Sequence, residues 1–153
     1  MRKQYLNPKE LFDPRFFTHS VTVTGPVKLV YVSGQVSYDR DGQVIGEGDM
    51  KAQAEQVFKS LTHNLAAAGA TWADVVKLNG YMVNMNPDDV NLYREVRSRY
   101  IRFPKMPAST LVGVQALVHE DLLLEVEVIA AIADAPDKRP AKAAARKRAK
   151  KKR

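Results

Sequence analysis

The segment LLLEVEVIAAI, residues 122–132, restricts the fold more than any other part of the chain. Its residues alternate between two rows, which predicts a β-strand with two different faces. One row is Leu122, Leu124, Val126, Val128, Ala130 and Ile132, and the other is Leu123, Glu125, Glu127, Ile129 and Ala131. If the first row packs against helices, Glu125 and Glu127 share the opposite face, roughly 7 Å apart. Both carboxylates then face a partner subunit, where a site between subunits can use them.

Two segments have the pattern of capped amphipathic helices. From Asp49 to Ala68 the apolar residues recur at helical spacing, with Asp49 suited to the N-cap and Gly69 to the stop. A second helix is expected to begin with Asn86 as its N-cap and Pro87 at its first helical position. The buried stripe of this second helix is predicted to contain Val90, Tyr93, Val96 and Tyr100.

Further strands are expected at residues 20–24, 28–37, 74–84 and 108–117. Gly25 and Pro26 separate the first two, which predicts that these two strands form a β-hairpin. With the strand at 122–132, the order along the chain is ββ, α, β, α, ββ. The predicted fold class is therefore α+β, with two helices on one face of a mixed sheet.

The predicted strands are apolar on both faces, although two helices can cover only one. In the strand at 28–37, Val30 and Val32 alternate with Leu29 and Tyr31. An apolar sheet face of this width is unfavourable in water. We therefore expect the subunit to associate with other copies through its uncovered face.

Composition limits the chemistry and the location. The 153 residues suit one domain, which we place at residues 1–134. There is no cysteine, so catalysis must use carboxylates, hydroxyls, histidines or the backbone. The three histidines, His19, His63 and His119, have no zinc-site spacing, and no metal site is predicted.

No apolar run approaches the roughly 18 to 20 residues of a membrane span, and the start lacks an apolar signal region, so we expect a cytoplasmic protein.

The net charge of +7 comes from the C-terminal end. Residues 138–153 hold ten of the 24 basic residues and no acid, which leaves 14 bases against 17 acids in residues 1–137. We predict a disordered tail rich in Lys, Arg and Ala over residues 135–153. This tail either serves solubility or binds nucleic acid and other polyanions non-specifically through residues 138–153.

Five segments together resemble one known family. They are VYVSGQV (30–36), AAAGATWADVVKLNGYMV (66–83), YREVRSRYI (93–101), PASTLVGVQAL (107–117) and LLEVEVIA (123–130). In this order and spacing they resemble the Rid family, also called YjgF or reactive-intermediate deaminase proteins. The resemblance covers about residues 16–132.

The resemblance implies a chorismate-mutase-like subunit in a homotrimer, with the sheets lining a central barrel and a small-molecule ligand in a cleft at each subunit interface. Members of the family hydrolyse imines and enamines such as 2-aminoacrylate to 2-keto acids and ammonia, without metal or cofactor. Older labels call relatives endoribonucleases. The implied catalytic residue is Glu125, which activates water. The implied ligand-binding residues that persist are Ser33, Gly34, Thr110 and Leu111, the last two through their backbone.

The chain departs from the family at two implied binding positions. Deaminase members carry an arginine that clamps the substrate carboxylate where this chain has Ser109. Loss of that clamp is expected to reduce the binding free energy of a carboxylate substrate by on the order of 3 kcal/mol or more. A family tyrosine matches Phe17, and His19 lies near the predicted cleft.

Two hypotheses follow. The first is an imine or enamine deaminase of the 2-iminobutanoate/2-iminopropanoate type, with weak activity on 2-aminoacrylate. The second is a non-enzymatic binding module that the basic tail tethers to nucleic acid. Without the resemblance, Glu125 also fits a structural strand residue, and Ser33 fits a residue that stabilises a turn.

Overall fold

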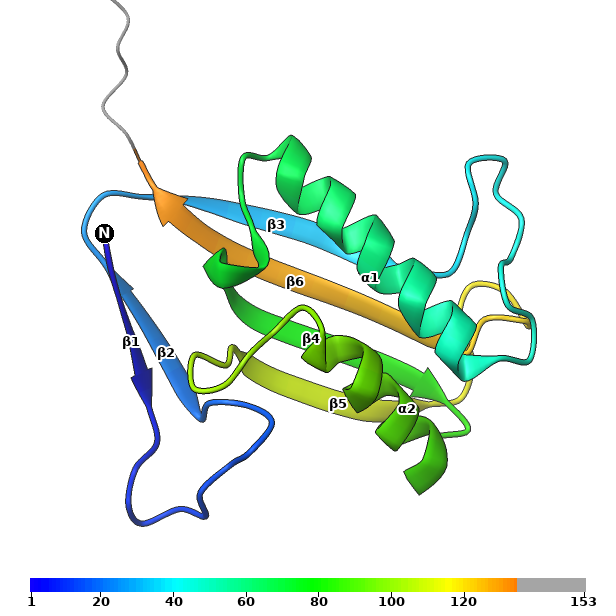
Figure 1. The fold of residues 1–153 in the computed structure, drawn as a ribbon, viewed down its shortest axis with the longest axis horizontal. Helices are drawn as coiled ribbons and strands as arrows, with labels where there is room; N and C mark the ends of the chain where they lie inside the picture. The colour runs from blue at the N-terminus through cyan, green and yellow to red at the C-terminus, as the bar shows by residue number, and fades with distance from the viewer. Residues whose placement is uncertain (135–153) are drawn as a thin grey trace, which may run out of the picture.

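The computed structural model describes residues 1–134 and places two helices against one face of a mixed β-sheet (Figure 1). The predicted basic tail, residues 135–153, lies outside the described residues. The elements are β1 (Arg2–Leu6), β2 (Ser20–Thr24), β3 (Val27–Gln35), α1 (Met50–Ala67), the short 3-10 helix η1 (Trp72–Asp74), β4 (Val75–Val83), α2 (Pro87–Ser98), β5 (Ala108–Val114) and β6 (Leu124–Ala133). The predicted α+β class is confirmed.

The main sheet has the strand order β3-β6-β4-β5. Strand β6 pairs antiparallel with both β3 and β4, whereas β4 and β5 are parallel. A parallel pair needs a crossover connection, and α2 provides it between β4 and β5. Strands β3 and β5 are therefore the two edges of this sheet.

The core lies between the sheet and the helices. The predicted apolar row of β6 faces it, because Leu124, Val126, Val128 and Ala130 are all at most 1% exposed. Phe58 of α1 is fully buried and stacks on Trp72 and Tyr100, with ring centroids 5.3 Å and 5.1 Å away. The aromatic stack closes the end of the core beneath η1.

The helix boundaries follow the predicted caps. The Asp49 side chain accepts a hydrogen bond from the Ala52 amide at 3.0 Å, and α1 ends just before Gly69, whose φ is +76°. The Asn86 side chain accepts hydrogen bonds from the amides of the second and third residues of α2, and Pro87 is the first residue of that helix. Local sequence therefore determines where both helices begin.

A buried amide connects α1 to the start of β6. The Gln53 side chain is fully buried, and its Nε2 donates to the carbonyl oxygens of Gly46 and Asp121 at 3.1 and 2.7 Å. Its Oε1 accepts from the Leu123 amide at 2.8 Å. One side chain thus joins three segments of the chain.

The predicted hairpin of residues 20–24 and 28–37 is wrong. Strand β2 pairs antiparallel with β1 in a separate two-stranded sheet, and β3 pairs with β6 (Figure 1). The Gly25–Pro26 connection carries the chain from one sheet to the other instead of folding β3 back on β2. Strand β1, with the sequence RKQYL, was not predicted because it lacks apolar alternation.

The uncovered face of the sheet exposes apolar side chains at its margins, as predicted. Leu29 and Tyr31 of β3 are 46% and 71% exposed, and Val112 of β5 is 40% exposed. Within residues 1–134, neither helix combines the length and apolar character needed to cross a bilayer. The same residues contain no group of three or more potential metal ligands.

Candidate functional site

Glu125 lies on β6 against a glycine of the neighbouring strand. The pairing of β3 with β6 shifts its register between Val32 and Gln35, and Gly34 falls in this irregular segment. A side-chain carbon added at Gly34 would collide with the carboxylate of Glu125. Gly34 therefore leaves the space that the carboxylate occupies, and the exposed residue Ser33 precedes it.

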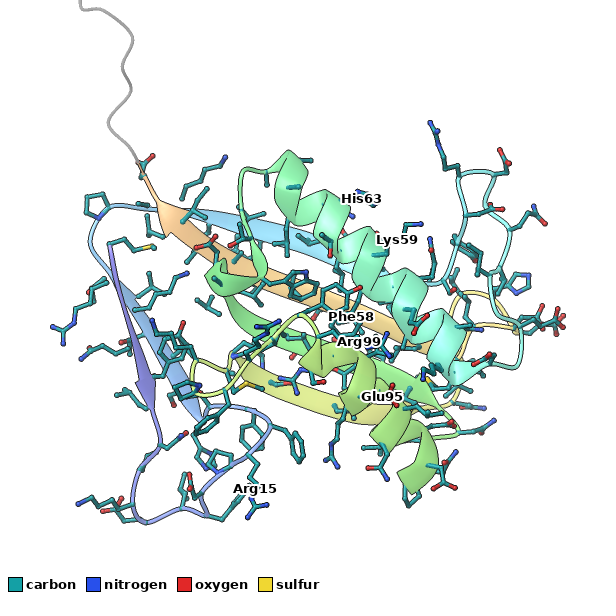
Figure 2. The ribbon with its side chains drawn as sticks, in the orientation of Figure 1. Arg15, Phe58, Lys59, His63, Glu95 and Arg99 are labelled. Atoms are coloured by element: carbon teal, nitrogen blue, oxygen red, sulfur yellow. The ribbon has the colours of Figure 1, made fainter. Side chains whose placement is uncertain are left out.

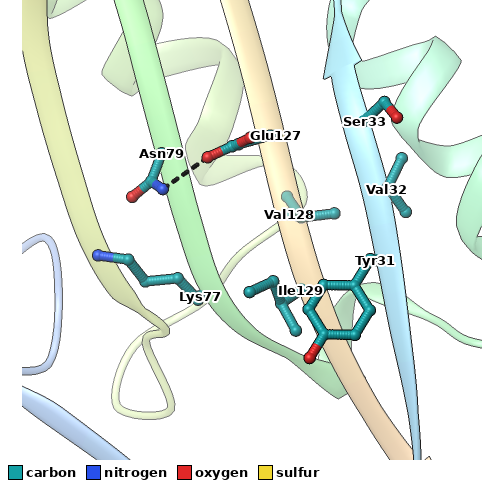
Figure 3. A pocket seen from close by; sticks show the side chains of 8 residues that line it. All are labelled: Tyr31, Val32, Ser33, Lys77, Asn79, Glu127, Val128 and Ile129. Carbon is teal, nitrogen blue, oxygen red and sulfur yellow. Dashed lines mark hydrogen bonds between the residues drawn. The ribbon is translucent and has the colours of Figure 1, made fainter.

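The two carboxylates of β6 differ in their surroundings. Oε1 of Glu127 accepts a hydrogen bond from Nδ2 of Asn79 at 2.7 Å (Figure 3). It accepts a second one from the Tyr81 hydroxyl at 3.0 Å. The hydrogen bond to Glu127, together with burial and the negative charges of Glu127 and Glu125, raises the pKa of Tyr81. In the described part of the chain, no hydrogen bond or ion pair engages the carboxylate of Glu125. Glu127 is thus held in place, whereas Glu125 has free oxygen atoms for a ligand or water.

An open depression surrounds Glu125 at the β3 edge of the sheet. Its volume is about 510 Å³, and it is lined by Gly34, Gln35, Val36, Tyr38, Asp39, Ser60, Val118 and Glu125. Gln35 is fixed there, because its Nε2 donates to the Ser33 carbonyl at 3.1 Å and its Oε1 accepts from Asn64 at 3.1 Å. We call Gly34, Gln35, Glu125 and the adjoining Ser33 the carboxylate edge, which is one half of the candidate site. Ser33 itself lines the neighbouring pocket beside Glu127 (Figure 3).

The remaining predicted residues gather at the opposite edge, on and beside β5. The Thr18 amide donates to the Pro107 carbonyl at 3.1 Å, and Thr18 forms a parallel bridge with Ala108. Residues 17–19 therefore run alongside the start of β5. We call this group the β5 edge (Phe17, His19, Ser109, Thr110 and Leu111).

His19 belongs to an aromatic cluster in the loop between β1 and β2. Its ring lies edge-on to Phe12 and Phe17, with centroids 5.3 Å away in each case. Its Nε2 is 2.9 Å from the Phe12 carbonyl oxygen, and its amide donates to Asn7. These contacts fix the ring in the loop, with Phe17 beside it.

The β5 residues alternate between the two faces of the sheet. Ser109 is paired with Leu78, which is fully buried under the helices, so Ser109 lies on the helix-covered side. Thr110 is on the uncovered side, where its hydroxyl accepts a hydrogen bond from Nζ of Lys77 at 2.9 Å. Leu111 returns to the covered side and packs against Gly80, where an added side-chain carbon would lie 2.9 Å from Cδ1 of Leu111.

The two edges do not meet within one chain. Glu125 pairs with Tyr81, and Tyr81 pairs with Val112, which is three residues along β5 from Ser109. Two strand spacings and three residues along a strand separate Glu125 from Ser109 by roughly 14 Å. Within one chain the predicted site residues thus form two separate groups, which we call half-sites.

The other two histidines lie outside both half-sites. His119 is in the turn before β6 and accepts a hydrogen bond from the Asp121 amide at 3.2 Å. His63 is exposed on the outer side of α1 (Figure 2). Sequence reasoning missed Asn79 and Tyr81, because no local pattern marks the partners of Glu127.

Comparison with known proteins identifies the family of the chain. The family model described as endoribonuclease L-PSP matches residues 15–132, which include both helices and the whole main sheet except Ala133, the last residue of β6. The chain belongs to this family, the YjgF/Rid family. The predicted family and its chorismate-mutase-like α+β fold are thus confirmed.

Individual Rid-family relatives are similar over most of their length. A RutC family protein of Pyrococcus abyssi is 37% identical over 102 residues, which are 67% of this chain and 77% of the relative. The 2-iminobutanoate/2-iminopropanoate deaminase of Dermatophagoides farinae is 31% identical over 103 residues, again 67% and 77% of the two chains. The crystal structure of the Rid-family protein YyfB from Yersinia pestis superposes with a TM-score of 0.76 at 33% identity, covering 86% of this chain and all of that one.

Proposed function

We propose that three copies of the chain assemble so that the β5 edge of one subunit meets the carboxylate edge of the next. The exposed apolar residues Leu29, Tyr31 and Val112 on the uncovered face support an association of this kind. The separation of the two half-sites within one chain supports it further. The resulting clefts would each bind a small metabolite between subunits.

We propose that these clefts hydrolyse small imines or enamines of the 2-iminobutanoate/2-iminopropanoate type. An enamine first takes up a proton at carbon and loses one from nitrogen, which gives the imine. Water then adds to the C=N carbon as Glu125 accepts a proton from the water, and transfer of that proton to nitrogen gives a carbinolamine. The hydroxyl group of the carbinolamine gives up its proton and the amino group takes one up, through Glu125, as the C–N bond breaks, which releases ammonia and leaves a ketone. The free carboxylate of Glu125, beside the engaged carboxylate of Glu127, is the observation that carries this assignment.

The substrate preference follows from the β5 edge. Ser109 carries no positive charge and lies on the helix-covered side, so it offers no bidentate clamp to a substrate carboxylate. Activity on 2-aminoacrylate would accordingly be weak. Imines with a different shape or charge would be the better substrates.

The test is ammonia release from enzymatically generated imines, including 2-iminobutanoate and 2-aminoacrylate. Glu125→Gln should lower the rate by about 100-fold or more, because the amide cannot accept the proton. Glu127→Gln is the matched control, which changes the neighbouring carboxylate on the same strand and face. Equal rates for wild type and Glu125→Gln would contradict the mechanism, and efficient 2-aminoacrylate hydrolysis would contradict the role given to Ser109.

The basic C-terminal segment favours a second function. We propose that residues 138–153, with ten basic residues and no acid, tether the assembly to nucleic acid. Three tails in one assembly would raise the avidity through effective concentration. A chain truncated after Asp137 should lose salt-sensitive retention on DNA or RNA, and unchanged retention would remove this function.

A further inference from the structure

A cationic cavity lies between α2 and the N-terminal loop, away from the carboxylate edge. Its volume is about 160 Å³. The cavity is lined by Arg15, Phe16, Arg94, Arg97, Ser98, Ile101, Phe103 and Met106. None of these residues is acidic. Figure 2 shows Arg15 on the loop before β2.

Arg97 is the unusual member of this group. It is only 5% exposed, and its Nε and Nη2 are buried atoms without a hydrogen-bond partner in the described chain. A guanidinium group stays protonated in proteins, so this burial leaves a positive charge uncompensated. Burial, with the charge of Arg94, lowers the pKa of Arg97.

Glu95, the acidic residue of α2 next in sequence to Arg94, is engaged elsewhere. Glu95 pairs with Lys51 of α1 and with Arg99 at 3.0 and 2.9 Å, and Arg99 also pairs with Glu55 of α1. Figure 2 labels Glu95 on α2 and Arg99, which is the C-cap of that helix. Arg94 instead lies over the Phe16 ring, with its central guanidinium carbon 4.4 Å from the ring centroid. In residues 1–134, none of Arg15, Arg94 and Arg97 forms an ion pair.

The free donors of Arg97 fit one kind of ligand. Nε and one terminal nitrogen form an edge of the planar guanidinium, whose parallel N–H groups match the two oxygens of a carboxylate. The aromatic and aliphatic side chains of Phe16, Ile101, Phe103 and Met106 favour an apolar remainder. A volume of about 160 Å³ holds about five groups of the size of water, which suits a short chain.

We propose that this cavity is a binding site for a small monocarboxylate with a short apolar chain, held by the Arg97 guanidinium. The two donors are shielded from solvent in the free chain, so the ligand reaches them by displacing a neighbouring side chain. Phe103, which is 75% exposed, is the wall residue with the least packing to lose. The site is independent of the proposed catalytic role of Glu125.

The test uses butanoate as the probe, measured by calorimetry and saturation-transfer NMR on the full chain at low salt. Butanoate should bind, and its methyl protons should receive saturation from the protein. Butylamine has a similar chain and the opposite charge, and it should not bind. Absence of butanoate binding, or equal binding of butylamine, would overturn the proposal. Binding of inorganic phosphate without butanoate would overturn the carboxylate assignment.

Variants locate the site. Arg97→Met and Arg97→Lys should each weaken butanoate binding by about tenfold or more, because neither provides the two-pronged donor edge. Arg99→Met, at the C-cap of the same helix, is the matched control and should bind within about twofold of wild type. Glu125→Gln should also retain binding, which separates this site from the proposed catalytic cleft. Undiminished binding by a folded Arg97→Met protein would refute the assignment, and the comparison of butanoate with butylamine tests it without any variant.

Discussion

The two faces of the main sheet differ in what their side chains do. The helix-covered face is apolar and closed, with Leu124, Val126 and Val128 of β6 essentially inaccessible. The opposite face of the same strand carries Glu125 and Glu127, which are half-buried and lie beside polar groups of β3 and β4. One row of β6 side chains therefore stabilises the core, and the other row carries the candidate catalytic groups.

Removing the aromatic ring of Phe58, which α1 packs into the core against the covered face, should have the largest effect on stability. Phe58→Ala should lower the free energy of unfolding by about 3–5 kcal/mol, because it empties the centre of the aromatic stack. Tyr31→Ala, on the uncovered face, is the comparison and should instead weaken association between subunits. Denaturant unfolding and sedimentation measure the two effects. An equal loss of unfolding free energy in both variants at a concentration where subunits are separate would refute the distinction between the faces.

A methyl group at Gly34 should disturb the open face. Gly34→Ala places a carbon where the Glu125 carboxylate lies, so the flexible end of that side chain must shift to make room. Deaminase activity should therefore fall, while stability should fall by less than the roughly 1–3 kcal/mol that overpacking of a rigid core costs. Gly42→Ala is a control for stability alone, because an added carbon there meets no atom within 4 Å, although the positive φ of Gly42 adds some strain. Full activity of Gly34→Ala would show that the position of Glu125 does not matter.

Loss of a helix cap should have a smaller effect that is confined to the covered side. Asp49→Ala removes the acceptor of the Ala52 amide and should cost about 1 kcal/mol of stability. Asp49→Ser, which keeps an acceptor, should recover most of this loss. Activity per folded subunit should stay unchanged, and thermal unfolding with an activity assay would check both statements.

The smallest expected effect is the loss of stability at low pH that follows protonation of Asp74, which contacts Lys3 of β1. Burial alone would raise the pKa of Asp74, but hydrogen bonds from Thr71 and Lys3 outweigh it and lower the pKa. The stabilisation from these bonds is complete above the unfolded pKa, about 3.9, and is lost as the pH falls through the lower folded value. Wild type should therefore lose more stability than Asp74→Asn below about pH 4. Identical pH profiles would indicate that the Lys3–Asp74 contact, at 3.2 Å, contributes nothing.

The sequence predicted those parts of the fold that local chemistry determines. Asp49 and Asn86 mark helix starts because their side chains bond amides two or three residues away. The pairing of β2 with β1 could not be predicted, since the polar strand Arg2–Leu6 lies 13 residues before β2 and has no apolar pattern. Burial of one row of β6 was predictable from Leu124 to Ala130, where the residues alternate, whereas Ala131 of the other row is also fully buried.

The sequence predicted which residues belong to the candidate site but not how they are arranged. Glu125 and Glu127 are indistinguishable in the sequence, and they differ because Asn79 and Tyr81, more than 40 residues away, bind only Glu127. The side of the sheet on which Ser109 lies was equally hidden, because small residues on both sides of it give no alternation signal. Arg97 was part of a family signature, and its burial without a hydrogen-bond partner, on which the proposed binding site rests, could not be predicted from the sequence.

The hydrogen bonds of the Gln53 side chain fix the register of β6 in the sheet. Its amide holds the Asp121 carbonyl and the Leu123 amide at once, immediately before β6 begins. A slip of one residue would exchange the two rows of the strand, and would put carboxylates into the core. The backbone amide of Leu123 should consequently be among the last in the molecule to exchange with deuterated solvent.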